Sequence, residues 1–146
     1  LMLTIDVDPC INRLCAPRRD LLQVMLNLLN NAIDCSSEGG RITLTVRVEP
    51  DAIRMAVFDQ GVGIPPENLP HIFDPFFTTK TGGDQKGMGL GLYISQSLVM
   101  AMGGKIEVQT QPNGGSTFSV LLPRHMAMAC AQDRFDTINK EVMPHD

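Results

Sequence analysis

Amide side chains recur at four-residue intervals in a leucine-rich stretch of the chain, at Gln23, Asn27 and Asn31. Residues four apart lie on one face of an α-helix, so these amides would form a polar stripe. An amide carbonyl is a hard oxygen donor that suits Mg²⁺, which takes few protein ligands beside nucleotide phosphates. A solvated helix face is the alternative interpretation of any single amide. Three in register among leucines favour a site, with Asn27 and Asn31 as candidate metal ligands.

A carboxylate ends an alternating apolar run further along the chain. Asp59 has the same period-two parity as Ile53 and Val57, so on a β-strand it would point to the same side, toward the interior. A buried carboxylate is costly unless turn amides or a ligand supply donors to it. Gly61 and Gly63 follow, and their missing side chains would let a flat ring approach the backbone. A simple glycine turn is the alternative interpretation of this short motif.

A second glycine motif, KGMGLGL, occupies residues 86–92. It ends an irregular stretch and precedes a helical pattern, and the backbone N–H groups at such a helix start can bind an anion. The motif lacks the Lys-Ser/Thr ending of a P-loop, and its glycine spacing departs from the G-x-G-x-x-G dinucleotide fingerprint. The sequence therefore indicates a polyphosphate site outside these two common nucleotide folds.

Between the glycine motifs, residues 72–80 read IFDPFFTTK and hold three of the six phenylalanines. A long irregular loop inside a compact domain is usually functional, and an aromatic cluster can anchor a mobile lid. Packing of the phenylalanines on the edge of the core is the alternative interpretation. Lys80 is more typical of a surface charge than of a phosphate ligand. We expect the segment from about Pro65 to Lys86 to be mobile without nucleotide.

Hydrophobic periodicity predicts helices and hairpins around these motifs. The fold class that follows is a two-layer α/β (α+β) sandwich with a mixed, mostly antiparallel sheet and helices on one face. The predicted strands are a half-buried one at 2–8 and two hairpins, 41–49 with 52–59 and 105–110 with 116–122, and the predicted helices are 18–35 and 90–102.

Composition narrows the class of protein further. The chain has 146 residues and a formal net charge of −4, which disfavours a nonspecific nucleic-acid binder. It has no apolar run near the ~18 residues of a membrane span and no secretory signal, so we expect a cytoplasmic domain without direct membrane contact. The four cysteines and three histidines lack metal-ligand spacing, which favours reduced thiols.

The order of these motifs over about residues 4–123 resembles the catalytic domain of bacterial sensor histidine kinases. QVMLNLLNNAID is similar to the family's N box, DQGVGI to its first glycine box, FDPFFTTK to its F box and GMGLGLYIS to its second glycine box. The resemblance implies the Bergerat-type ATP-binding fold shared with gyrase B, mismatch-repair ATPases and the heat-shock chaperone, with a sheet of about five strands. It also implies a catalytic domain at 1–123 with an ATP lid at about 64–90, followed by a tail or linker at 124–146.

The resemblance assigns roles to individual residues, with ATP and Mg²⁺ as cofactors. Asn27 and Asn31 would bind Mg²⁺ and phosphate, and Asp59 the adenine amino group. Ser116 would reach adenine through water, and its parity with Phe118 independently points it toward the interior. The remaining implied nucleotide-binding residues are Gly61, Gly63 and Ile64 in the first glycine box, Phe73 and Lys80 in the lid, and Gly87, Gly89, Leu90 and Gly91 in the second glycine box.

Two features of the sequence favour a kinase over an ATPase. Hydrolytic relatives carry a Glu four residues before the second Asn to activate water, and this chain has Asn27 there. The phosphoacceptor histidine segment is missing, and His71, His125 and His145 do not match it. The chain is therefore predicted to bind ATP but not to autophosphorylate.

The resemblance also implies partners. They are the dimerisation and histidine-phosphotransfer domain of the same protein and the receiver domain of a response regulator, with no nucleic acid, and the full-length protein can be membrane-anchored. An anti-sigma-factor-type serine kinase of the same fold and a nucleotide-free interaction module are the alternative functions.

Overall fold

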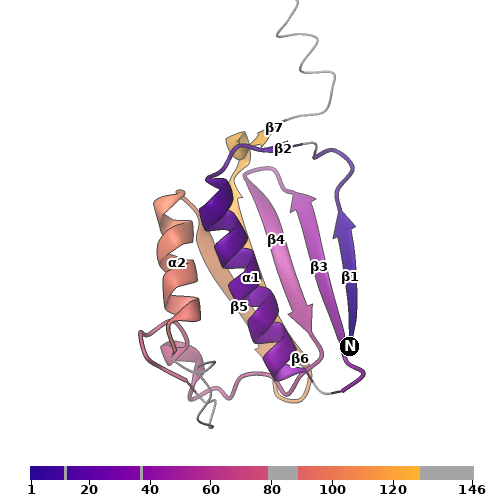
Figure 1. Ribbon diagram of the computed structural model, residues 1–146, viewed down its shortest axis with the longest axis vertical. Coiled ribbons are helices and arrows are strands. Elements are labelled where there is room, and N and C mark those ends of the chain that lie inside the picture. The colour runs from indigo at the N-terminus through magenta and orange to yellow at the C-terminus, as the bar shows by residue number, and fades with distance from the viewer. Residues whose placement is uncertain (12, 37, 79–88, 129–146) are drawn as a thin grey trace, which may run out of the picture.

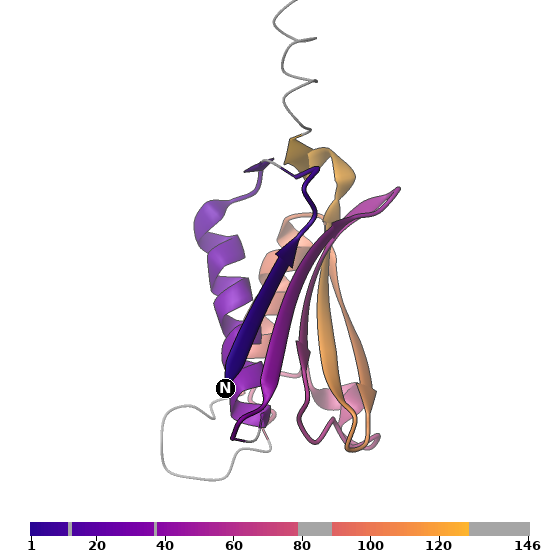
Figure 2. The same cartoon turned by 90° about the vertical axis from the view of Figure 1, so that its right-hand side faces the viewer.

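A five-stranded sheet carries two α-helices on one face in the computed structural model (Figures 1 and 2). The structure describes residues 1–11, 13–36, 38–78 and 89–128. The sheet has the strand order β1-β3-β4-β6-β5. Its strands are β1 (Met2–Val7), β3 (Arg41–Val48), β4 (Ala52–Asp59), β5 (Lys105–Gln111) and β6 (Gly115–Pro123), and the helices are α1 (Arg18–Cys35) and α2 (Gly91–Ala101). This is the predicted two-layer fold class.

The strand pairing explains why the sheet is mixed. β1 runs parallel to β3, whereas β3–β4, β4–β6 and β5–β6 are antiparallel pairs. The two hairpins were predicted from period-two alternation, and both form. The β4–β6 pairing is a long-range contact, and its register places Asp59 directly opposite Ser116.

Helix α1 forms where the chain is free of glycine and proline. Pro17 precedes its first turn, where a missing N–H costs nothing. The helix ends at Cys35 and is capped by Ser36, whose hydroxyl donates to the Ala32 carbonyl at 2.7 Å. One face of α1 buries Val24 and Leu28 completely. Full burial of such a side chain contributes about 1.5–3 kcal/mol, so this face fixes α1 against the sheet.

The core lies between α1, α2 and the helix-facing side of the sheet. Alternate residues of β4 and β6 supply much of it, among them Ile53, Val57, Phe118 and Val120. Asp59 continues the same face at the end of β4, with 1% of its surface exposed. The inward orientation predicted for this carboxylate is therefore present in the structure.

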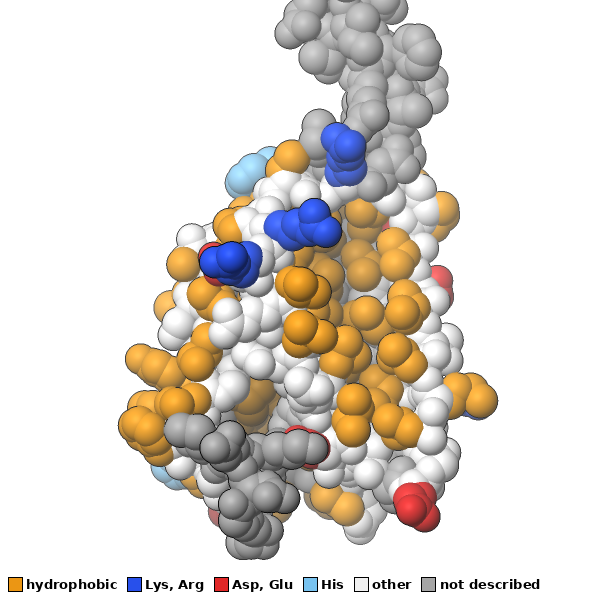
Figure 3. All heavy atoms as spheres, viewed as in Figure 1, with side chains coloured by type: hydrophobic (Ala, Val, Ile, Leu, Met, Phe, Trp, Pro, Cys, Tyr) orange, Lys and Arg blue, Asp and Glu red, His pale blue; other side chains and the backbone are white. Residues whose placement is uncertain are grey.

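Strand β1 differs from the half-buried strand that its alternation predicts. Leu3, Ile5 and Val7 pair with the helix-facing residues of β3 but are 51%, 59% and 47% exposed. On α1, Leu22, Leu26 and Ile33 are exposed as well, and Figure 3 shows hydrophobic side chains gathered over this face. The alternation identified the strand correctly. It could not show that α1 packs on β4 and leaves β1 uncovered by the described residues.

Part of the long loop between β4 and α2 is packed. It contains a short 3₁₀ helix, η1 (Leu69–His71), after which Ile72 is buried in the core. Phe73 and Phe77 are partly buried against the same core, whereas Phe76 is 72% exposed. Core packing, the alternative interpretation of the aromatic cluster, thus applies to two of its three phenylalanines. Of the segment predicted to be mobile, from about Pro65 to Lys86, the part beyond Thr78 lies outside the described residues.

Beyond the sheet, the chain returns to its N-terminal part. The 3₁₀ helix η3 (Arg124–Met126) leads into β7 (Ala127–Met128), which pairs with β2 (Arg13–Leu14) ahead of α1 (Figure 1). No helix in the described ranges is long and apolar enough to span a membrane.

Candidate functional site

Asp59 is the buried carboxylate at the end of β4. Its Oδ1 accepts a hydrogen bond of 2.9 Å from the backbone N–H of Gly61. Burial raises the pKa of Asp59, and hydrogen bonds from the backbone N–H groups of Gly61 and Ser116 only partly oppose the rise. No cation pairs with it among the described residues. The carboxylate is therefore held in place by backbone donors while its charge remains poorly compensated, which suits an acceptor for a ligand's N–H.

The first glycine motif is packed tightly between two elements. A Cβ at Gly61 would lie 2.3 Å from the carbonyl oxygen of Cys35, at the end of α1, and a Cβ at Gly63 would lie 2.2 Å from that of Gln111. Gly63 also has φ +77°, a conformation that favours glycine. The sequence suggested that these glycines leave room for a flat ring. In the structure, protein backbone takes that room, and the glycines let the loop lie against α1 and β5.

A hydroxyl cluster connects this loop to the β5–β6 hairpin. Thr110 Oγ1 accepts the Ile64 N–H at 2.8 Å and lies 3.0 Å from Ser116 Oγ. Ser116 is 5% exposed and faces Asp59 across the β4–β6 pairing. Asp59, Gly61, Gly63, Ile64 and Ser116 are thus brought together at one end of the sheet, in agreement with the sequence-based grouping.

Thr110 was missed by the sequence reasoning. The sequence could have identified it, because Ile106, Val108 and Thr110 occupy alternate positions along β5. The antiparallel hairpin places Thr110 opposite Ser116. A polar residue ending an inward-facing series marks this position, as it marked Asp59 on β4.

Asn27 joins the two helices. Its Nδ2 group donates to the Gly91 carbonyl at 3.4 Å and to Ser95 Oγ at 3.2 Å, and Ser95 is completely buried. Because the amide nitrogen is directed at α2, the Oδ1 carbonyl is the atom suited to a cation. Asn31 lies one turn further along α1 and is half-buried, whereas Gln23 is exposed. The donor chemistry of Asn27 and Asn31 fits Mg²⁺.

The second glycine motif contacts the phenylalanine segment. Gly89 has φ +70°, and a Cβ there would lie 2.5 Å from backbone atoms of Phe76 and Phe77. The Phe76 N–H donates to the Gly89 carbonyl at 3.0 Å. Gly91 begins α2, next to Asn27, and Leu90 is half-buried before it. Gly87 and Lys80 lie outside the described residues.

These contacts form one continuous arrangement. The C-terminal end of α1 meets Gly61, its middle meets the start of α2 through Asn27, and the β4–β6 register sets Asp59 beside Ser116. A buried acid with backbone donors, amide oxygens and a helix start are the groups that can bind a base, a metal ion and phosphates respectively.

The sequence model of the histidine kinase-, DNA gyrase B-, and HSP90-like ATPase family matches residues 16–126, and the chain belongs to this family. Such an ATPase domain binds ATP. Among curated relatives, the alginate biosynthesis sensor protein KinB of Pseudomonas aeruginosa is 39% identical over 121 residues, covering 83% of this chain and 20% of KinB. The sensor histidine kinase RcsC of Escherichia coli (strain K12) is 43% identical over 109 residues, covering 73% of this chain and 11% of RcsC. The chain therefore spans a fifth or less of the length of these relatives.

Solved structures agree with the sequence matches. The nucleotide-free catalytic domain of histidine kinase ThkA superposes with a TM-score of 0.73 at 34% identity, covering 84% of this chain and 80% of that one. Full-length ShkA in complex with AMPPNP gives a TM-score of 0.74 at 29% identity, covering 88% of this chain and 26% of that one. Within its family, the chain is thus an ATPase domain of the histidine kinase type found in two-component sensor kinases. The serine-kinase alternative is not favoured.

Proposed function

We propose that this domain holds Mg-ATP and presents the γ-phosphate to a histidine on a separate dimerisation domain of the same protein. The observation that carries the proposal is the buried Asp59, fixed by the Gly61 N–H beside Ser116. The exocyclic amino group of adenine would donate to the carboxylate oxygen that Gly61 leaves available. A charged acceptor in a buried site makes such a hydrogen bond strong.

The phosphates would lie toward the helices. Asn27 Oδ1 and Asn31 Oδ1 would hold Mg²⁺, with Gly87, Gly89 and Gly91 around the phosphates and Lys80 and Phe73 in the lid at about 64–90. The bound ion would supply neutralisation of phosphate charge. The support is the position of Asn27, whose Nδ2 bonds to Gly91 and Ser95 fix the side chain at the start of α2.

The residue types favour phosphoryl transfer to another group over hydrolysis. An amide at position 27 cannot take a proton from water as a carboxylate can. Phosphoryl transfer depends mainly on positioning and on electrostatic stabilisation, which the Asn27–Gly91–Ser95 junction can supply. A nucleophile would then come from outside the chain, which fits the multidomain sensor kinases among the relatives.

The remaining assignments concern the whole protein. We infer a catalytic unit at 1–123 followed by a tail at 124–146, a cytoplasmic location, a response-regulator receiver domain as partner, and no nucleic acid or direct membrane contact for this domain. The relatives are sensor proteins of several times this length, which supports the further domains.

Titration calorimetry with ATP, with and without Mg²⁺, tests the binding step. We expect saturable ATP binding that is stronger with Mg²⁺ than without it. In Asn27→Ala and Asn31→Ala, ATP affinity should no longer depend on Mg²⁺. Radiolabelled phosphate should then move to the dimerisation domain when that domain is added in trans. Absence of ATP binding by the folded chain would favour the interaction-module alternative and contradict the proposal.

A further inference from the structure

Thr110 lies where the first glycine loop meets the β5–β6 hairpin. Its Oγ1 accepts a hydrogen bond from the Ile64 N–H at 2.8 Å, lies 3.0 Å from Ser116 Oγ, and lies 3.3 Å from the Gly115 carbonyl oxygen, to which it can donate. A Cβ added to Gly63 would lie 3.1 Å from Thr110 Oγ1. One side-chain atom therefore contacts the loop after Asp59, the hairpin turn and the hydroxyl that faces Asp59.

The direction of the hydrogen bond between Thr110 and Ser116 depends on where the Thr110 hydroxyl donates its proton. A threonine hydroxyl has one proton to donate and can accept two, and here the Ile64 N–H occupies one acceptor position. If Thr110 donates to Gly115, the Ser116 proton can point to Thr110, and Ser116 presents lone pairs elsewhere. If Thr110 donates to Ser116, the Ser116 proton is available to a ligand. Thr110 thus controls which hydrogen-bonding group Ser116 presents near Asp59.

A second tether separates this role from simple attachment of the loop. The Asn113 N–H donates to the Val62 carbonyl at 2.9 Å, so a backbone bond joins the loop to the hairpin turn independently of Thr110. Without the Thr110 hydroxyl, the loop would stay attached at Val62. The Ile64 N–H would lose its partner, and Ser116 would lose the neighbour that orients its proton.

We propose that Thr110 is a positioning residue for base recognition, which orients Ser116 and the Gly63–Ile64 peptide around the purine that Asp59 binds. This inference rests on the proposed function, because it assumes that the base lies between Asp59 and Ser116. Thr110 acts through Ser116 and Ile64 and is not itself assigned to the ligand.

Thr110→Val removes the hydroxyl and keeps the shape of the side chain. We expect the Kd for ATP to rise about tenfold, the equivalent of one ordinary hydrogen bond, and Thr110→Ser to restore it to within about twofold. The matched control is Thr45→Val, because Thr45 lies on β3 on the face of the sheet away from the helices and pairs with Ala56. Its Kd should equal that of the unchanged protein.

Inosine triphosphate distinguishes positioning from general loosening, because its base has a carbonyl in place of the adenine amino group. Thr110→Val should lower the preference for ATP over inosine triphosphate, whereas a loosened fold would weaken both equally. Thr110→Ala provides a second hydroxyl-free variant if the valine variant unfolds, with thermal unfolding recorded for each.

Unchanged ATP affinity in Thr110→Val, equal losses in the valine and serine variants, or equal losses for the two nucleotides would overturn the inference. Failure of the unchanged protein to bind ATP is a different result, since it would remove the proposed function itself.

Discussion

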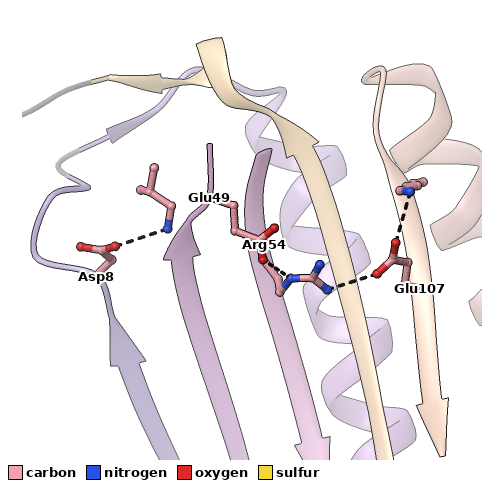
Figure 4. Close-up of polar contacts among 6 residues, drawn as sticks. Asp8, Glu49, Arg54 and Glu107 are labelled. Atoms are coloured by element: carbon pink, nitrogen blue, oxygen red, sulfur yellow. Dashed lines mark hydrogen bonds and ion pairs between the residues drawn. The ribbon is translucent and has the colours of Figure 1, made fainter. Parts of the chain in front are cut away.

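Carboxylates at the two ends of the sheet lie in opposite electrostatic environments. Near the start of β4, Arg54 pairs with Glu49 and with Glu107 at 3.2 Å, and Lys105 pairs with Glu107 at 3.2 Å (Figure 4). At the other end of β4, Asp59 is buried and receives backbone N–H groups only. Paired surface charges contribute modestly to stability, whereas a buried, unpaired carboxylate opposes it. Because of this contrast, we expect ligand binding at the second end.

The pKa directions follow the same division. Hydrogen bonds from Lys105 and Arg54 lower the pKa of Glu107, and backbone N–H groups of Cys10 and Val48 lower that of Asp8. Burial raises the pKa of Asp59. A site that will bind a donor can hold a buried carboxylate without a cationic partner. Among the carboxyl groups with shifted pKa values in the described residues, Asp59 alone has a raised pKa.

Replacing the buried carboxylate should give the largest change. Asp59→Asn keeps the shape but loses the charged acceptor, so we expect ATP affinity to fall about 100-fold or more, as for a strong hydrogen bond to a charged group. The free energy of unfolding should not fall, because the desolvated charge is gone. Calorimetric titration and denaturant unfolding measure the two quantities.

Asp6→Asn is the matched control at the other end of the sheet. Asp6 is exposed and pairs with Arg47 at 2.5 Å, so its loss should leave ATP affinity unchanged. Equal affinities for ATP in Asp59→Asn and the unchanged chain would show that the division between the two ends has no role in binding.

Gly63→Ala should produce the next largest effect. The new Cβ would meet the Gln111 carbonyl oxygen at 2.2 Å with φ at +77°, and strain with a backbone clash costs roughly 1–3 kcal/mol. Gly39→Ala isolates the strain, because Gly39 has φ +74° and nothing within 4 Å of the new atom. Denaturant unfolding should show a smaller loss for Gly39→Ala than for Gly63→Ala. Equal losses would mean that contact with β5 adds nothing to the constraint on the loop.

The pH dependence of binding sharpens the comparison. Because the pKa of Asp59 is raised, the carboxylate gains its proton at a higher pH than an ordinary Asp, and ATP affinity should begin to fall there as pH decreases. Asp59→Asn should lack this component, and comparison of the two proteins cancels the titration of the nucleotide. Parallel affinity profiles for the two proteins would contradict an ionised Asp59 as the acceptor.

Stability should respond to pH with opposite signs at the two ends. A raised folded-state pKa means that protonation favours the fold, so the contribution of Asp59 to stability becomes less unfavourable as pH falls through its folded pKa toward the ordinary Asp value of 3.8. The lowered pKa values of Asp8 and Glu107 mean that these carboxylates stabilise the fold at pH values above their unfolded-state pKa. This stabilisation is lost as pH falls through their folded-state pKa values. In acid unfolding, Asp59→Asn should therefore lose the former component alone.

Local patterns were sufficient to predict the elements and the inward Asp59, because side-chain alternation and helix periodicity are properties of short segments. The contacts between segments were not accessible in the same way. That Gly61 lies against Cys35 and Gly63 against Gln111 depends on how α1 and β5 approach the loop. The exposure of Ile5 likewise depends on where α1 packs. Identifying Thr110 as a site residue required the register of the β5–β6 hairpin to be combined with the side-chain alternation along β5.

The smallest effect is expected at the ion-paired end of the sheet. Arg54→Met keeps the aliphatic stem but removes the bonds to Glu49 and Glu107. Because these groups are partly exposed and screened by water, the melting temperature should fall by only a few degrees, and less in high salt. ATP affinity should not change, since Arg54 lies at the opposite end of β4 from Asp59. A change in ATP affinity without a change in melting temperature would mean that the charged end of the sheet communicates with the site, and the two ends could no longer be treated as separate.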